Sequence, residues 1–279
     1  MPVRIVTDST SDLPPGLAAE LGVTVVPLTV FFGDEAFLDG VEIDAPTFYE
    51  RLRSSPVLPR TSQPSTEAFR AEYERLAEET DEIVSIHLSS KLSGTFNSAS
   101  LAREEVSREI HIELIDSYNV SVGLGAIVIE AALAARSGAS LADVAAAARW
   151  AMDRVHWVAF LDTLEYLHKG GRIGRARSLL GSILSIKPLL HCEDGEIAPF
   201  ERVRTRARAI ERLYEIATAD LTVKRLFVVA AGNDADARDL MDRLRPVMPH
   251  TELLLAQLGP VVGVYAGPNA LGVCITLHD

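Results

Sequence analysis

The chain has little cysteine and too little positive charge to balance its acids. Its 279 residues include only Cys192 and Cys274 and carry a formal net charge of −12. The two cysteines lie far apart and form no pair with metal-ligand spacing, so we interpret them as reduced core thiols. The negative charge argues against sequence-independent nucleic-acid binding, which needs a basic face, and against attraction to anionic lipid. A local basic patch is compatible with this balance.

Long apolar runs and a secretion signal are also missing. The most apolar stretch, residues 122–135, is interrupted by Glu130 and is too short to cross a bilayer. The start, Met1-Pro-Val-Arg-Ile5, has the pattern of a strand and lacks the apolar segment of a signal peptide. We therefore expect a cytoplasmic protein with no integral membrane segment.

The common signatures of catalytic and metal sites do not occur. There is no Gly-x-Ser-x-Gly, no His-Glu-x-x-His and no Walker loop, and the seven histidines show no metal-ligand spacing. Asp8, Asp12 and Asp116 could bind a divalent metal. Two of them lie beside expected helix starts, where a carboxylate caps the helix equally well, so we favour the capping interpretation.

What the first half does contain is an alternation of strands and helices. Strands are expected near residues 4–6, 23–32, 83–88 and 110–115, and helices near 15–21, 66–76, 95–107, 120–137 and 140–154. This alternation predicts a parallel, Rossmann-like sheet with helices on both faces. Residues 24–60 break the rhythm with turn signals and predict a small β-rich excursion with one helix, 46–53.

The second half alternates less strictly. Strands are expected near residues 155–161, 183–190, 197–203, 225–230, 252–256 and 272–277, and helices near 163–169, 205–218 and 235–245. The predicted fold is therefore α/β with two domains, an N-terminal α/β domain over residues 1–157 and a C-terminal α+β domain over 158–279. The sequence contains no internal repeat and no low-complexity segment.

The strongest local signal is a hydroxyl-rich loop between a strand and a helix. Ser89, Ser90, Ser93 and Thr95 follow the apolar strand and precede the helix, with Gly94 among them. A helix N-terminus offers free N–H groups and a positive dipole end, so it favours an anion. We predict an oxyanion site with Ser93 and Thr95 as donors; ordinary N-capping, which needs only one or two of these hydroxyls, is the alternative.

Three further segments offer weaker signals. Thr61 and Ser62 would supply a second wall of hydroxyls if they lie opposite Ser93, although a plain turn before a helix is favoured from this stretch alone. Arg172 follows a double glycine and suits phosphate or carboxylate recognition, or it lies in a solvated basic turn. A basic run is either a docking face for an acidic partner or a solvated edge; it comprises Arg202, Arg204, Arg206, Arg208 and Arg212.

Taken together, the motifs resemble those of the DegV family over essentially the whole chain. In order they are Thr7-Asp-Ser-Thr-Ser-Asp-Leu-Pro14, Thr61-Ser-Gln-Pro-Ser65, Leu88-Ser-Ser-Lys-Leu-Ser-Gly-Thr95, Ile115-Asp-Ser117, Leu164-Glu-Tyr-Leu-His-Lys-Gly-Gly-Arg172, Ile186-Lys-Pro188 and Leu258-Gly-Pro260. The resemblance implies two α/β-type domains with a long-chain fatty acid, such as palmitate, stearate or oleate, buried between them. Some members of that family present the acyl carboxylate to a separate ATP-dependent fatty acid kinase subunit and carry the acyl phosphate away.

The resemblance also implies a set of ligand-binding residues. Thr61 and Ser93 would hold the carboxylate together with the backbone N–H of Gly94, and Ser62 and Thr95 would lie beside them. Arg172 would lie close to the head group or the kinase contact. One position departs from the family pattern, because Tyr265-Ala-Gly-Pro-Asn269 stands where His-Thr-Gly-Pro-Gly is usual. Tyr265 can donate a hydrogen bond but supplies no positive charge at neutral pH.

The main hypothesis is a fatty acid carrier with no cofactor and no catalytic activity of its own. The alternative is a metal-dependent phosphoryl-transfer enzyme acting on a small polar substrate, with its metal at Asp8 or Asp116, and a third is a partner-docking module without a ligand. For the acyl tunnel the candidate lining is an Ala-rich helical stretch and an apolar cluster, although a plain core role is favoured for each of these residues taken singly. They comprise residues 126–135 and Leu179, Leu180, Ile183 and Leu184.

Overall fold

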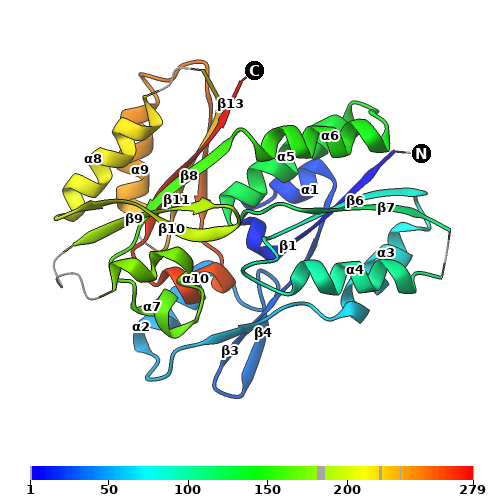
Figure 1. Ribbon diagram of the computed structural model, residues 1–279, viewed down its shortest axis with the longest axis horizontal. Helices are drawn as coiled ribbons and strands as arrows, with labels where there is room; N and C mark the ends of the chain where they lie inside the picture. The colour runs from blue at the N-terminus through cyan, green and yellow to red at the C-terminus, as the bar shows by residue number, and fades with distance from the viewer. Residues whose placement is uncertain (1, 108, 181–185, 220–221, 233, 279) are drawn as a thin grey trace.

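The structure is a computed structural model that describes residues 2–107, 109–180, 186–219, 222–232 and 234–278. Two separate sheets, one parallel and one mixed, stand at opposite ends of the longest axis, and helices pack on both (Figure 1). This mixed α/β architecture confirms the predicted fold class. None of the helices in the described ranges is long and apolar enough to cross a membrane.

The N-terminal half is built on a parallel sheet of four strands, β1 (Arg4–Asp8), β2 (Val23–Val26), β6 (Glu82–His87) and β7 (His111–Asp116). Their order is β2-β1-β6-β7, and every neighbouring pair is parallel. The carboxyl ends of parallel strands meet at one edge of the sheet, where ligands gather in such folds. The predicted loops after Asp8, Leu88 and Asp116 therefore lie together.

Helices cover both faces of this sheet (Figure 1). On one face lie α1 (Leu17–Leu21), α5 (Val122–Arg136) and α6 (Leu141–Met152), and on the other α3 (Thr66–Leu76) and α4 (Thr95–Glu105). Helix α5 is apolar almost all round because it packs on the parallel sheet, on α6 and on the second sheet at once. Its one buried acid, Glu130, pairs with Arg225 and Lys224 of the C-terminal half.

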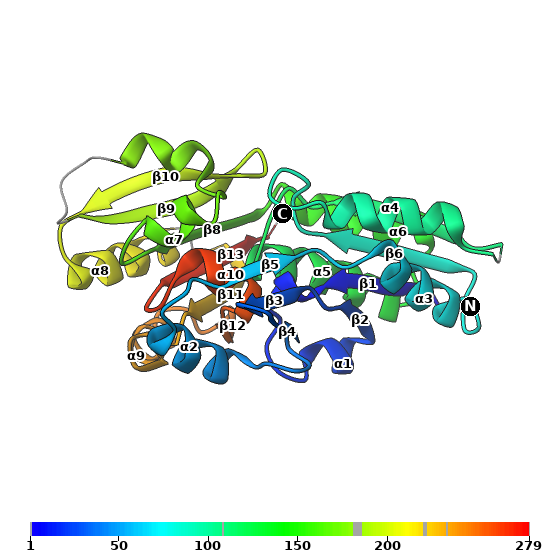
Figure 2. The ribbon, with the colours of Figure 1, turned by 90° about the horizontal axis from the view of Figure 1, so that it is seen from below.

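The predicted β excursion is a three-stranded antiparallel sheet with the order β4-β3-β5. Its strands are β3 (Thr29–Phe32), β4 (Glu35–Leu38) and β5 (Arg60–Ser62), and the expected helix is α2 (Ala45–Ser54). Strand β5 is short, and it carries Thr61 and Ser62 to the middle of the molecule, beside α10 (Figure 2).

The C-terminal half is built on a mixed sheet of six strands in the order β10-β9-β8-β13-β11-β12. The strands are β8 (Val155–Phe160), β9 (Lys187–Glu193), β10 (Glu196–Val203), β11 (Val223–Ala230), β12 (Glu252–Gln257) and β13 (Leu271–Leu277). Helices α8 (Arg206–Ala217) and α9 (Asp234–Leu244) pack on one face. Part of the strand predicted at 183–190 lies outside the described residues.

The other face of the mixed sheet looks toward α5 and the excursion. Here lie α7 (Glu165–Lys169), a 3-10 turn at Gly174–Leu179 and α10 (Pro260–Ala266). Helix α10 was not predicted from the sequence. One apolar core runs from β6 and α5 through to β11 and α10, so the two halves share buried side chains. The division into two domains near residue 158 stays a prediction.

Candidate functional site

A cavity of about 350 Å³ lies between the two halves. Most of its lining is apolar. The lining residues come from both halves of the molecule, including β8, β9, β11, β13 and α10. The apolar lining residues are Leu28, Leu88, Leu92, Val120, Val122, Trp157, Val158, Ala159, Leu161, Leu167, Leu190, Ile197, Val229, Leu258, Val261, Val262, Ala266, Gly272 and Val273. An enclosed apolar space of this kind suits an apolar ligand.

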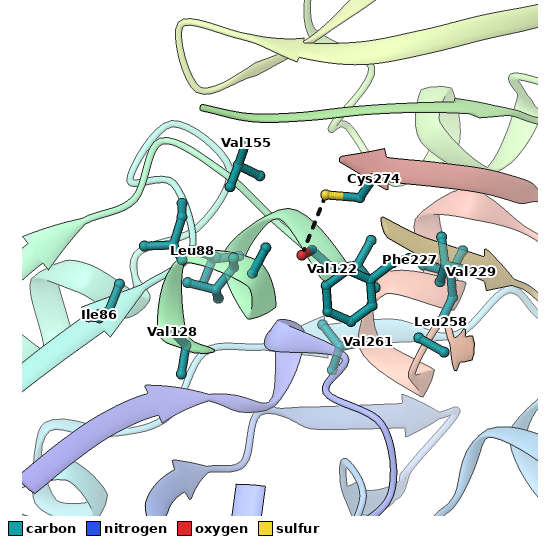
Figure 3. Close-up of a cluster of buried hydrophobic side chains, with 14 of the residues drawn as sticks. Ile86, Leu88, Val122, Val128, Val155, Phe227, Val229, Leu258, Val261 and Cys274 are labelled. Atoms are coloured by element: carbon teal, nitrogen blue, oxygen red, sulfur yellow. Dashed lines mark hydrogen bonds between the residues drawn. The ribbon is translucent and has the colours of Figure 1, made fainter. Parts of the chain in front are cut away.

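Figure 3 shows part of this lining within the surrounding core. Leu88 and Val122 approach from the N-terminal half, and Val229, Leu258 and Val261 from the C-terminal half. The Cys274 thiol lies 3.8 Å from the Val122 carbonyl oxygen and so also joins the two halves. Burial raises the pKa of this thiol, which keeps it neutral, as expected for a reduced core cysteine.

Polar groups gather at one part of the cavity wall. They are Thr61, Ser62, Gln63, Ser93, Arg172 and Tyr265, whereas the other polar lining residues, Thr10 and Ser121, donate hydrogen bonds to Asp8 and Asp12. The Thr61 hydroxyl and the Tyr265 hydroxyl are hydrogen-bonded at 2.5 Å, and the Arg172 guanidinium lies 5.3 Å from the centroid of the Tyr265 ring. Ser62, Gln63 and Arg172 are exposed, so this polar end is where the cavity reaches the surface.

Arg172 is the cation of this polar end. Its Nε donates to the Leu92 carbonyl at 3.2 Å and its Nη1 to the Gly170 carbonyl at 3.0 Å. Within the described ranges it has no carboxylate partner. Arg175, three residues further on, bonds to three carboxylates. In a chain with a net charge of −12, a guanidinium left without an anion beside an apolar cavity is suited to bind one.

The double glycine before Arg172 has a steric role. A side chain at Gly170 would place its Cβ 2.5 Å from the Tyr265 ring, closer than real Cβ contacts come. Gly170 thus lets the Tyr265 ring lie against α7, and its carbonyl accepts a bond from Arg172.

The predicted oxyanion loop is only partly on the cavity wall. Ser93 lines the cavity, and its hydroxyl shares a 2.9 Å hydrogen bond with Thr95 and accepts from the Thr95 amide at 3.3 Å. Thr95 is buried behind the wall, and Gly94 does not line it. The space over Gly94 holds the Gln63 side chain, whose Oε1 lies 2.2 Å from where a Cβ would be.

Ser89 and Ser90 make hydrogen bonds that fix the backbone of the loop. The buried Ser89 hydroxyl donates to the Gly195 carbonyl at 2.8 Å, which joins the loop to the β9–β10 hairpin. The Ser90 amide donates to Asp116 at 3.2 Å. Of the four hydroxyl residues in this loop, only Ser93 lines the cavity.

The aspartates considered for a metal are occupied by hydrogen bonds. Asp8 accepts from the Thr10 amide and hydroxyl, from the Leu88 amide and from His87 Nδ1, at 2.5–3.1 Å. Asp116 accepts from the Ser90 and Tyr118 amides. Across the described parts of the chain, no group of three or more His, Cys, Asp or Glu side chains could hold a metal ion.

A pair of buried acids lies beside the start of α10. Asp12 accepts from the Ser121 hydroxyl at 2.5 Å and from the Gly259 amide at 2.9 Å. Asp39 accepts from the Ser9 hydroxyl at 2.8 Å and from the Val261 amide. Burial raises the pKa of Asp12 well above its usual value and that of Asp39 to about 7, because both carboxylates lose hydration. Sequence reasoning treated Asp12 as a cap and did not single out Asp39.

Of the residues predicted to line an acyl tunnel, none that the structure describes lines the cavity. Residues 126–135 are core residues of α5, Leu179 and Leu180 are also absent from the lining, and Ile183 and Leu184 lie outside the described residues. The cavity lining comes mainly from strands of the mixed sheet and from α10. Those residues could not be separated from core by pattern alone, because a cavity-facing strand residue is as apolar as a packed one.

The arginine run is largely neutralised. Arg206 pairs with Asp162 and Asp236, and Arg208 and Arg212 share Glu215. Arg202 and Arg204 are exposed and have no acidic partner within the described ranges. A docking role for the run stays a prediction that rests on these two side chains.

The fold and the site define a class: an α/β protein with one parallel and one mixed main sheet and an apolar internal cavity that is polar and cationic where it reaches the surface. Comparison with known proteins gives the family. A profile described as "Uncharacterised protein, DegV family" matches residues 2–277. A DegV domain-containing protein of Streptomyces coelicolor is 40% identical, with 98% of each chain covered. Protein DegV of Bacillus subtilis is 34% identical, with 98% of this chain and 99% of that protein covered. The chain belongs to the DegV family.

Solved structures of the family are similar along the whole chain. DegV from Bacillus subtilis, described as a fatty acid binding protein, has a TM-score of 0.93 at 34% identity, with 100% of both chains covered. A DegV family protein from Thermus thermophilus, described by its fatty acid binding, has a TM-score of 0.91 at 34% identity, again with 100% of both covered.

Proposed function

We propose that this protein binds one long-chain fatty acid in the cavity between its two halves, with the carboxylate at the polar end. The observation that carries the proposal is the combination of an apolar cavity with an Arg172 guanidinium that has no carboxylate partner. The fatty acid binding described for the DegV proteins of Bacillus subtilis and Thermus thermophilus supports it.

The two ends of the ligand would contribute differently. A chain of roughly fifteen methylenes buried at about 0.8 kcal/mol each gives on the order of 12 kcal/mol before the costs of binding. Each hydrogen bond to a charged carboxylate adds only about 1.5–3 kcal/mol. The apolar lining therefore sets the affinity, and Thr61, Ser93, Tyr265 and Arg172 set the orientation.

Charge favours one orientation of the chain. Arg172 lies at the polar end, whereas Asp12 and Asp39 lie beside Gly259 at the opposite end of α10 from Tyr265. A carboxylate is attracted to the first position, whereas at the second the two buried carboxyl groups already use the nearby Ser121 and Ser9 hydroxyls. The head group should therefore face the surface.

The test is whether the purified protein carries an acyl chain. We expect mass spectrometry of an organic extract to show a fatty acid in stoichiometric amount, and the stripped protein to take up oleate or palmitate. Protein that is free of lipid as purified and also fails to take up either acid would overturn the proposal.

We further propose that the protein presents the carboxylate to a separate ATP-dependent fatty acid kinase subunit and is not catalytic alone. The exposed polar end supports this, since a bound carboxylate there could be reached by a partner, and Arg202 and Arg204 offer unpaired surface cations. With such a kinase, Ser93→Ala should reduce acyl-phosphate formation more than it reduces oleate binding. Equal phosphorylation of the variant and the wild type would contradict this role.

A further inference from the structure

Three side chains of the N-terminal half hold the segment that leads into α10. The Asp12 carboxylate accepts from the Gly259 amide at 2.9 Å, and the Asp39 carboxylate accepts from the Val261 amide. The Tyr49 hydroxyl donates to the Leu258 carbonyl at 3.1 Å. Residue 260 is proline and has no N–H, so both acids use the amides that the start of this short helix leaves free.

These three side chains are themselves fixed. Asp12 and Asp39 are 7% and 4% exposed, and Tyr49 is 1% exposed. The Ser121 hydroxyl holds Asp12 and the Ser9 hydroxyl holds Asp39. The approach is also close, because a Cβ on Gly259 would lie 2.8 Å from Asp12 Oδ1. The segment that leads into α10 can therefore keep its position only while the Asp12 and Asp39 side chains stay in place.

Helix α10 carries the other side of the candidate ligand site. Val261, Val262, Tyr265 and Ala266 all line the cavity, and Tyr265 reaches Thr61 of β5. On its opposite side α10 packs on α2, where Gly263 lies against Phe48 and Tyr49. A shift at Gly259 would move the whole short helix, and with it the Tyr265 hydroxyl.

We infer that Asp12 and Asp39 are positioning residues for the carboxylate end of the cavity: they fix the start of α10 and thereby hold Tyr265 against Thr61. This inference rests on the proposed fatty acid binding. It assigns a function to two buried acids that do not line the cavity, in a place where burial disfavours their charge.

The experiment compares oleate with oleyl alcohol, which has the same chain and no carboxylate. Asp12→Ala should lower the affinity for oleate roughly tenfold or more while changing the affinity for the alcohol less than about threefold, because a small shift of α10 breaks directional hydrogen bonds to the carboxylate and largely keeps its apolar contacts with the chain. Asp12→Asn should restore most of the preference, since an amide oxygen can still accept from the Gly259 amide while its NH₂ group donates to Ser121.

Asp44→Ala is the matched control. Asp44 also accepts a helix-start amide, that of Thr47 at 2.9 Å, but it is exposed and contacts neither α10 nor the cavity. It should leave both affinities within about twofold. An equal loss for oleate and oleyl alcohol in Asp12→Ala would overturn the inference, because that result describes a general loss of packing.

Tyr49→Phe keeps the test decisive if Asp12→Ala does not fold. It removes the bond to Leu258 without opening a cavity, and it should lower the preference for oleate over the alcohol in the same direction. An unchanged preference in Tyr49→Phe and in Asp39→Ala, which removes the acceptor altogether, would overturn the inference. If the wild type binds neither ligand, the proposed function itself fails, and this outcome is distinct from a failure of the positioning role.

Discussion

Two polar regions of this protein, both close to the carboxyl edge of the parallel sheet, differ in how completely their groups are paired. In the closed region, Tyr73, Ser85, His87 and Asp8 form a chain of hydrogen bonds at 2.7–3.0 Å, and all are fully buried. In the open region, at the polar end of the cavity, Arg172 has only carbonyl partners and is exposed.

The difference in pairing indicates that the closed region stabilises the fold and that the open region is available for a ligand. The serine, histidine and aspartate of the closed region stand in the order of a hydrolase triad, yet they have no exposed surface, and Tyr73 takes the remaining serine contact. A substrate cannot reach them. A buried network that satisfies all its members stabilises the fold, whereas a cation that lacks an anion is available for a ligand. The substitutions below test this comparison, from the largest expected effect to the smallest.

Asp8→Ala should have the largest effect, and on stability. It leaves the Leu88 and Thr10 amides and the His87 ring without their acceptor inside the core. We expect the free energy of unfolding in urea to fall by about 3–5 kcal/mol. Asp116→Ala, which removes a half-exposed acceptor of two amides, should cost about 1 kcal/mol. Equal losses in the two variants would contradict the distinction.

In its degree of pairing, Asp39 is intermediate between the closed and the open region, because its carboxylate is hydrogen-bonded but its negative charge is uncompensated. Burial, with the nearby charge of Asp8, raises its pKa to about 7, compared with about 3.9 in an unfolded chain. Between these values the folded state holds a proton that the unfolded state releases. Stability should therefore fall as the pH rises toward 7, by up to about 1.4 kcal/mol per pH unit from this group.

Asp39→Asn should remove this contribution, and urea unfolding at about pH 5 and about pH 7 measures it. The neighbouring groups that also titrate or carry charge are Asp8, Asp12, Tyr49 and Arg53. They remain present in the variant, so the difference between the two pH profiles reports the carboxyl of Asp39 together with its electrostatic effect on Asp12 and Tyr49. Parallel pH profiles for the two proteins would show that the carboxyl of Asp39 does not titrate in this range.

Arg172→Gln should lower the affinity for oleate roughly tenfold to a hundredfold and leave the melting temperature close to that of the wild type. The reason is that the guanidinium has no acid to stabilise within the described chain. Arg175→Gln is the control, because Arg175 is already paired with three carboxylates. Calorimetric titration measures the affinity of both variants for oleate. An equal loss of affinity in Arg175→Gln would show that Arg172 acts only through general surface charge.

Thr61→Val should have the smallest effect, about two- to tenfold on the affinity for oleate. It removes the partner of the Tyr265 hydroxyl while keeping the shape of the side chain. Ser90→Ala, from the exposed part of the hydroxyl-rich loop, should change the affinity less than twofold because Ser90 does not line the cavity. If Ser90→Ala lowered the affinity more than Thr61→Val, the carboxylate would lie near Ser90 and not near Thr61, which would contradict the proposed position of the head group.

Much of the fold followed from the sequence, because the strand and helix periods of the first half are strong. Helix α10 did not, since seven residues that begin with Pro260 and include Gly263 give no helical period to detect. The polar residues of the site were recognisable as motifs, but their meeting depended on contacts across long sequence separations, such as Thr61 with Tyr265. The cavity could not be predicted, because Val229 or Val273 in a strand has the same pattern whether it faces a void or a neighbour.

The most direct test of the central claim is a crystal structure of the protein with oleate. We predict an acyl chain between the two sheets, with its carboxylate within hydrogen-bonding distance, about 3 Å, of Thr61 and Ser93 and close to Arg172. A carboxylate found beside Asp12 and Asp39, or an acyl chain bound outside the cavity, would contradict it.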